Sequence, residues 1–130
     1  MAECAAWDRE AAGSSPVIST IFLGGDTMTK LKIWVDDVRP APNESYVWCK
    51  TVNSVKRLLC DRHIITRYDI VVIDLDHDAG DYAKEGGDYV KILDWLEETG
   101  RRYPIHIHSM NPVGVANMRA IIQKNHWEEV

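Results

Sequence analysis

The sequence predicts an α/β fold with a doubly wound parallel sheet of about five strands. Short β-rich runs alternate with segments of helical periodicity, which is the pattern of strand–helix–strand units. The run at 69–75, DIVVIDL, is apolar along nearly its whole length, as expected of a strand covered on both faces. The chain has 130 residues, of which 45% are hydrophobic, and this suits one globular domain.

Four strands and a short fifth follow from the β-rich runs. They are predicted at 31–35, 46–52, 69–75, 104–108 and 126–130. The link at 38–45 contains prolines and Asn43, so it is predicted to be a loop. Trp34, Trp48 and Trp95 are interpreted as core residues because large aromatic side chains bury much apolar surface.

Three helices are predicted between these strands. The first begins at Asn53 or Ser54, since either side chain can accept a hydrogen bond from the first turn. Asp88 caps the second, and Gly100 ends it because glycine tolerates the left-handed conformation there. The last begins at Pro112, which suits a first helical position because no N–H is needed there.

The first 27 residues differ from the rest. They mix small residues with scattered charge, and a second methionine, Met28, directly precedes the first regular strand. We therefore predict an N-terminal extension at 1–27 and a compact domain at 28–130. The alternative is that 17–23, VISTIFL, forms an extra edge strand of the sheet.

Composition excludes several classes of protein. The net charge of -5 argues against a broad nucleic-acid surface. No apolar run approaches the roughly 18 residues of a membrane-spanning helix, and acidic residues stand where a signal peptide carries positive charge. Cys4, Cys49 and Cys60 form no CxxC pair, which predicts free thiols. We expect a cytoplasmic protein that has no membrane partner.

Polar side chains gather where three of the predicted strands end. Parallel strands end at one edge of their sheet, and ligands of such folds bind beyond that edge. The sequence therefore predicts one site built from distant segments. Its members are Asp36, Asp37 and Arg39, then Asp74, Asp76, His77 and Asp78, and finally His108, Ser109 and Asn111.

The crowded carboxylates favour a metal site. Several carboxylates within a few ångströms repel one another, and a hard divalent cation relieves that repulsion. We predict Asp36, Asp37 and Asp76 as its ligands, with Mg²⁺ as the metal and Mn²⁺ as the alternative.

The cationic and hydroxyl residues of the same clusters suit a phosphate. The planar guanidinium of Arg39 can bind two phosphoryl oxygens, and Ser109 can donate to another. His77 or His108 can transfer a proton near neutral pH. A small phosphorylated ligand or an RNA end is therefore the expected partner.

The order of these motifs resembles the receiver domains of two-component signalling. In that family paired acids hold Mg²⁺ and an acid at the third strand accepts a phosphoryl group. By position Asp74 matches the phosphoacceptor and Ser109 the hydroxyl residue. The match departs at 38–45, where a loop replaces the first helix, and in the last strand, which has no counterpart of the usual lysine.

A narrower resemblance covers about residues 31–122. The segments WVDDVRPAP, DLDHDAGD and HSMNPVGVANM together look like the receiver-like domains proposed to process cyclic phosphates. The resemblance implies metal-dependent hydrolysis or transfer at a cyclic phosphate of a nucleotide or RNA end, as in a cyclic phosphodiesterase. It implies catalytic roles for His77, His108, Asp78 and Ser109, and phosphate binding by Arg39, Ser109 and Asn111. The alternatives are a phosphoacceptor receiver of a signalling relay and a non-catalytic nucleotide-binding module.

Overall fold

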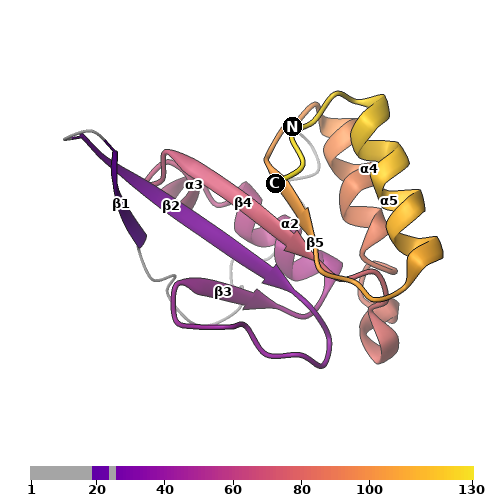
Figure 1. Ribbon diagram of the computed structural model, residues 1–130. Helices are drawn as coiled ribbons and strands as arrows, with labels where there is room; N and C mark the ends of the chain where they lie inside the picture. The colour runs from indigo at the N-terminus through magenta and orange to yellow at the C-terminus, as the bar shows by residue number, and fades with distance from the viewer. Residues whose placement is uncertain (1–18, 24–25) are drawn as a thin grey trace.

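A sheet with helices packed against it forms the centre of the molecule (Figure 1). The computed structural model describes residues 19–23 and 26–130. Strands β2, β3, β4 and β5 run parallel, and β1 pairs antiparallel with β2. The strands are β1 (Ser19–Leu23), β2 (Asp26–Val35), β3 (Tyr46–Cys49), β4 (Ile70–Leu75) and β5 (Ile105–Ile107). The prediction of an α/β fold with a parallel sheet is confirmed.

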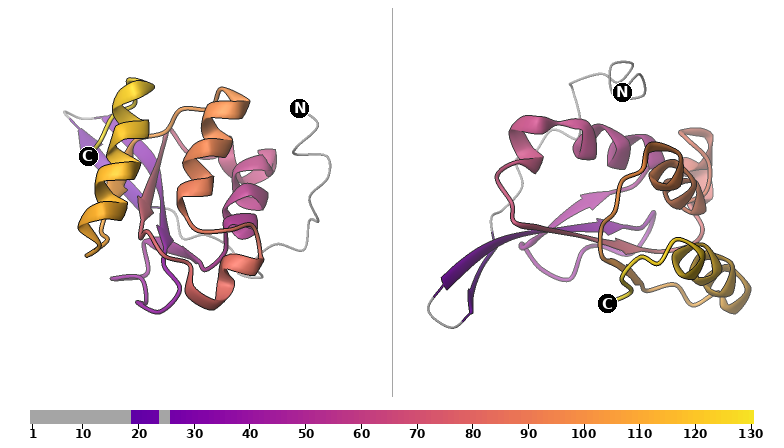
Figure 2. Two further views of the ribbon diagram at one scale, coloured as in Figure 1. Left: turned by 90° about the vertical axis from the view of Figure 1, so that its right-hand side faces the viewer. Right: turned by 90° about the horizontal axis from the view of Figure 1, so that it is seen from above.

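The helices connect the parallel strands and join a single hydrophobic core. Three of them, α2, α4 and α5, lie side by side with α4 between the other two (Figure 2). The helical segments are α2 (Val52–Cys60), α3 (Arg62–Ile65), the 3₁₀ turn η1 (Gly80–Lys84), α4 (Val90–Thr99) and α5 (Pro112–Lys124).

The core lies on one face of the sheet. Its strand residues alternate along the chain, because successive side chains of a strand point to opposite faces. They are Leu31, Ile33, Val35, Val47, Cys49, Val71, Ile73, Leu75 and Ile105. Trp34 and Val72 are also buried, yet they stand at the intervening positions and outside this cluster. The described helices share this one core, so among residues 19–23 and 26–130 the expected doubly wound arrangement, with helices on both faces of the sheet, is not seen.

The fifth strand of the sheet differs from the expected one. The link between β2 and β3, residues 36–45, contains bends and turns and no helix, and a loop was predicted at 38–45. The fifth strand of the sheet is the antiparallel β1. At the C-terminal end, Glu129 makes an isolated parallel bridge to Ile105, so a full final strand at 126–130 does not form.

The N-terminal prediction is covered only in part. Ser19–Leu23 forms β1, which pairs with β2 from Ser19 opposite Lys30 to Leu23 opposite Asp26. Residues 1–18 and 24–25, on which the rest of that prediction falls, lie outside the described residues. The domain boundary at Met28 stays a prediction.

Helix boundaries test the expected caps one by one. Gly100 ends α4 with φ of 72°, and Pro112 begins α5, so these predictions are confirmed. The first cap was wrong by a few residues: α2 is capped by Thr51, whose hydroxyl accepts from the N–H of Ser54 at 2.9 Å. Asp88 does not cap α4, because its carboxylate accepts instead from the N–H of Ala79 at 3.2 Å.

The two described cysteines differ in their bonding. Cys49 is a buried free thiol, whereas Cys60 is disulfide-bonded, so the expected free thiol is wrong at Cys60. Along residues 19–23 and 26–130, no helix has both the length and the apolar character needed to cross a bilayer.

Candidate functional site

The predicted site residues meet where the parallel strands end. In Figure 1 the arrowheads of β2, β3, β4 and β5 point toward the same edge of the sheet. The main-chain ladder continues one residue beyond the strands, since Asp76 N–H donates to the Val35 carbonyl and His108 N–H to the Leu75 carbonyl, each at 2.9 Å. These backbone hydrogen bonds therefore fix the positions of the Asp76 and His108 main chains, from which the two side chains extend.

His108 lies between two buried carboxylates. Its Nδ1 is 2.6 Å from Oδ1 of Asp74, and its Nε2 is 2.9 Å from Oδ2 of Asp36. Its ring stacks on the indole of Trp34, with centroids 3.8 Å apart and planes at 4°. Asp36 and Asp74 are only 2% and 7% exposed. Buried carboxylates need such partners, because an unpaired buried charge is costly.

Hydrogen bonding to these partners shifts the titration of the cluster. Burial, the largest single influence, would raise the pKa of Asp36, but the backbone N–H groups of Arg39 and Val38, together with His108, outweigh it and lower that pKa. Burial would likewise lower the pKa of His108, but its bonds to Asp74 and Asp36 outweigh burial and raise it. These hydrogen bonds thus favour the ionised form of Asp36 and the protonated form of His108.

The loop after β2 holds Asp36 in place. Its Oδ1 accepts from the N–H of Val38 at 2.9 Å and of Arg39 at 2.8 Å. Two indoles fix the same loop, because Trp48 Nε1 donates to the Asp36 carbonyl and Trp34 Nε1 to the Arg39 carbonyl, both at 2.8 Å. One oxygen of Asp36 is therefore used for loop structure, and the other faces His108.

Three of these side chains could hold a metal ion. One ligand atom each from Asp36, Asp76 and His108 lie within 4.8 Å of one another, a grouping found by searching residues 19–23 and 26–130. Two carboxylates and an imidazole are suitable ligands for a divalent cation. The donor set is compatible with a divalent metal, although His108 stands where Asp37 was predicted.

Asp37 lies beside this group. Burial, and then the negative charges of Asp36 and Asp76, raise its pKa. Its carboxylate also packs against Gly80, whose φ is 56° and where an added Cβ would overlap the carboxylate. Asp37 thus belongs to the acidic cluster, and its place among the ligands stays a prediction.

His77 and Asp78 form a second pair beside α5. His77 Nδ1 is 2.7 Å from Oδ1 of Asp78, and the side chains are 18% and 63% exposed. The imidazole packs against Gly114, where an added Cβ would overlap the ring. A carboxylate on Nδ1 orients the ring and leaves Nε2 for a ligand or a proton.

The remaining predicted residues lie on the loop after β5. Asn111 caps α5, with Oδ1 accepting from the N–H groups of Val113 and Gly114 at 3.1 Å, and its own N–H donates to Ser109 Oγ at 3.1 Å. Arg39 Nη1 donates to the His108 carbonyl at 3.4 Å, which brings the loop after β2 against the loop after β5. Ser109 and the Arg39 guanidinium therefore stand at the same strand ends as the acids.

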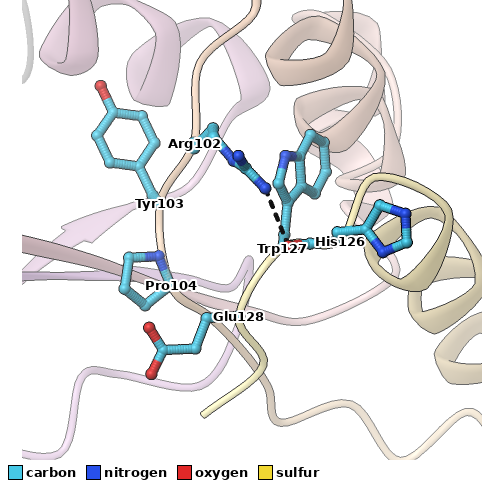
Figure 3. Close-up of a pocket in the computed structure, with 6 residues that line it drawn as sticks. All are labelled: Arg102, Tyr103, Pro104, His126, Trp127 and Glu128. Atoms are coloured by element: carbon cyan, nitrogen blue, oxygen red, sulfur yellow. Dashed lines mark hydrogen bonds between the residues drawn. The ribbon is translucent and has the colours of Figure 1, made fainter.

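A pocket of about 250 Å³ lies elsewhere, at the opposite end of β5 (Figure 3). Its lining residues are Arg102, Tyr103, Pro104, His126, Trp127 and Glu128. The guanidinium of Arg102 binds the carbonyls of Asn125 and His126 at 3.3 and 3.0 Å. Arg102 thus serves to hold the C-terminal segment in place. The acids at the strand ends, Asp36, Asp37, Asp74 and Asp76, form the better candidate site.

Trp34 and Gly114 were missed by sequence reasoning. Trp34 is buried, but it stacks on His108 on the face of the sheet opposite the core cluster. Of the three tryptophans expected in the core, only Trp95 belongs to that cluster. The alternation of β2 carried the signal, because Leu31, Ile33 and Val35 form the core face and Trp34 stands between them. No sequence signal showed that Gly114 would touch His77.

The comparisons with known proteins agree with the narrower resemblance. The family model described as "Cyclic-phosphate processing Receiver domain" matches residues 31–124. No curated protein and no solved structure matches the chain significantly. The matched span contains every residue of the acidic cluster, the histidines His77 and His108, and the whole of α5.

Proposed function

The chain belongs to the family of cyclic-phosphate processing receiver domains, and from this premise we propose metal-dependent hydrolysis or transfer at a cyclic phosphate of a nucleotide or an RNA end. One observation carries the proposal: the ligand atoms of Asp36, Asp76 and His108 converge within 4.8 Å at the ends of parallel strands. Sites of open α/β sheets lie at this edge.

Asp36, Asp76 and His108 would hold the metal, and His108 would release its Nε2 proton as the metal binds. A divalent cation bound there would act as a Lewis acid on a phosphoryl oxygen and offset the negative charge of the phosphate. Mg²⁺ prefers oxygen ligands alone, whereas imidazole is a usual ligand of transition metals. The nitrogen of His108 therefore favours Mn²⁺ over the Mg²⁺ that the acids alone suggest.

Arg39 and Ser109 would bind the phosphate. The planar fork of Arg39 can hold two oxygens, and the Ser109 hydroxyl can donate to a third. Asn111 contributes through its side-chain NH₂ group, since its oxygen is already used to cap α5. All three stand on loops that the contact between Arg39 and the His108 carbonyl joins.

His77 is the better candidate for proton transfer. Both nitrogens of His108 already face carboxylates, whereas Asp78 occupies only Nδ1 of His77. In hydrolysis, water adds to phosphorus, one P–O bond of the ring breaks, and the leaving oxygen takes up a proton. His77 would accept the proton from water or supply the one that the leaving oxygen needs, while Asp78 orients the ring.

Phosphorus NMR tests the proposal directly. The purified protein is incubated with 2′,3′-cyclic nucleotides in the presence of Mn²⁺, Mg²⁺ or a chelator. The expected result is a new phosphomonoester signal that requires metal, is absent with Asp76→Asn and is weakened in His77→Ala.

The matched control is Asp94→Asn. Asp94 is a partly exposed acid on α4, and its ion pair with Lys91, at 4.0 Å, contributes little to stability. This variant should turn over like the wild type. Tight nucleotide binding without turnover in any sample would contradict the enzyme and favour a non-catalytic binding module. A phosphoryl adduct formed from acetyl phosphate would favour a signalling receiver.

A further inference from the structure

The ring of His108 is fixed on three sides. Asp74 bonds to one nitrogen at 2.6 Å, Asp36 to the other at 2.9 Å, and Trp34 stacks on the ring face. The side chain of His108 is only 8% exposed. An imidazole held this way has one orientation, so its Nε2 has a defined direction.

Asp74 fixes this direction through its bond to Nδ1 of His108. It stands on β4 opposite Trp34 of β2, and two residues before Asp76, so it lies deeper on the same face of the strand. Asp74 is 7% exposed and its carboxylate bonds to His108, which leaves it poorly placed to react with a ligand from solvent. A buried carboxylate is costly unless it has a specific partner. Its placement is therefore explained by what it does to His108.

We propose that Asp74 is a positioning residue that holds His108 with Nε2 aimed at the Asp36 and Asp76 carboxylates. The proposal rests on the proposed function, because it assumes that these residues hold a metal. Histidines that bind metals commonly donate their other N–H to a carboxylate, which fixes the ring and its tautomer. Asp74 takes this role instead of the phosphoacceptor role that its sequence position suggests.

Isothermal titration of the protein with Mn²⁺ alone tests the role without reference to turnover. Asp74→Ala removes the acceptor, and it should weaken Mn²⁺ binding by about 10–100-fold. Asp74→Asn retains a neutral oxygen that can still accept from Nδ1, so its loss should be smaller. Asp94→Asn should bind like the wild type. Circular dichroism shows that each variant compared is folded.

A second measurement covers the protein without metal. Nitrogen NMR of the imidazoles at constant pH should show a hydrogen-bonded Nδ1–H on His108 in the wild type, and this signal should be lost in Asp74→Ala. The signal of His77 serves as an internal reference, because its partner is Asp78.

The outcomes separate this inference from the proposed function. Equal Mn²⁺ affinity in the wild type and in both Asp74 variants overturns the positioning role and leaves the metal site intact. An absence of Mn²⁺ binding by the wild type overturns both. Acetyl phosphate with Mg²⁺ provides a third arm, since a phosphoryl adduct that disappears in Asp74→Asn would make Asp74 a phosphoacceptor and overturn the positioning role.

Discussion

The contact between His77 and Gly114 gives the most quantitative prediction. In an ordinary helix, Gly→Ala stabilises by about 1 kcal/mol, because alanine has the higher helix propensity. At Gly114 an added Cβ would overlap the ring of His77. Overpacking of this kind costs about 1–3 kcal/mol. Gly114→Ala should therefore lower the free energy of unfolding by roughly 0–2 kcal/mol, the sum of these two effects.

A double-mutant cycle isolates the overlap. In a His77→Ala background the ring is gone, so Gly114→Ala should stabilise by about 1 kcal/mol. Urea denaturation of the four proteins gives the coupling energy, which we expect at about 1–3 kcal/mol. Ala116→Gly, at an exposed position of the same helix, is the control for propensity and should cost about 1 kcal/mol.

An equal change in both backgrounds would refute the reasoning. It would mean that His77 does not pack against α5, and the orientation assigned to this histidine would have to be abandoned. The same cycle has a functional side, because Gly114→Ala pushes the ring away from α5. If His77 transfers the proton, turnover of a 2′,3′-cyclic nucleotide by this variant should fall even where the protein stays folded.

Three further predictions concern stability. Tyr89→Phe removes the hydroxyl that donates to the Lys50 carbonyl at 2.6 Å, and it should cost about 1 kcal/mol of unfolding free energy; an unchanged urea midpoint would contradict this. Hydrogen bonds from Arg119 lower the pKa of Glu129, so their contribution is present above the unfolded pKa and is lost as the pH falls through the folded pKa. Arg119→Gln should therefore lower the melting temperature more at pH 7 than at pH 3, and equal losses would count against the pair. Mn²⁺ at 100 times its Kd should stabilise the wild type by about 2.7 kcal/mol, seen as a higher Tm, and Asp76→Asn should lose this shift; a wild-type Tm that ignores Mn²⁺ would remove the metal site.

Strand periodicity and strand direction made the edge of the sheet predictable. The apolar runs predict β2, β4 and β5, and the rule that parallel strands end together predicts that Asp36, Asp76 and His108 lie in one place. Cap positions were less predictable, since Thr51, Asn53 and Ser54 can all accept a first-turn N–H. The structure selects Thr51, because the preceding strand ends two residues earlier, at Cys49.

The arrangement around His108 could not be predicted from the sequence. It depends on strand register, which places Trp34 beside Asp74 and Asp74 beside His106. A shift of one residue would turn every one of these side chains to the other face. Sequence alternation gives the face of each residue within its own strand, but the pairing between strands comes only from packing of the whole sheet.

Metal binding and stability meet in the same side chain. His108 bonds to the buried carboxylates of Asp36 and Asp74. Removing one partner of a buried charged pair costs about 3–5 kcal/mol, and a domain of this size has only about 5–15 kcal/mol of stability. A His108→Ala variant that loses activity would therefore not show whether the site or the fold was lost. Asp76 is only partly buried, so Asp76→Asn separates the two, and it should be the first substitution made at this site.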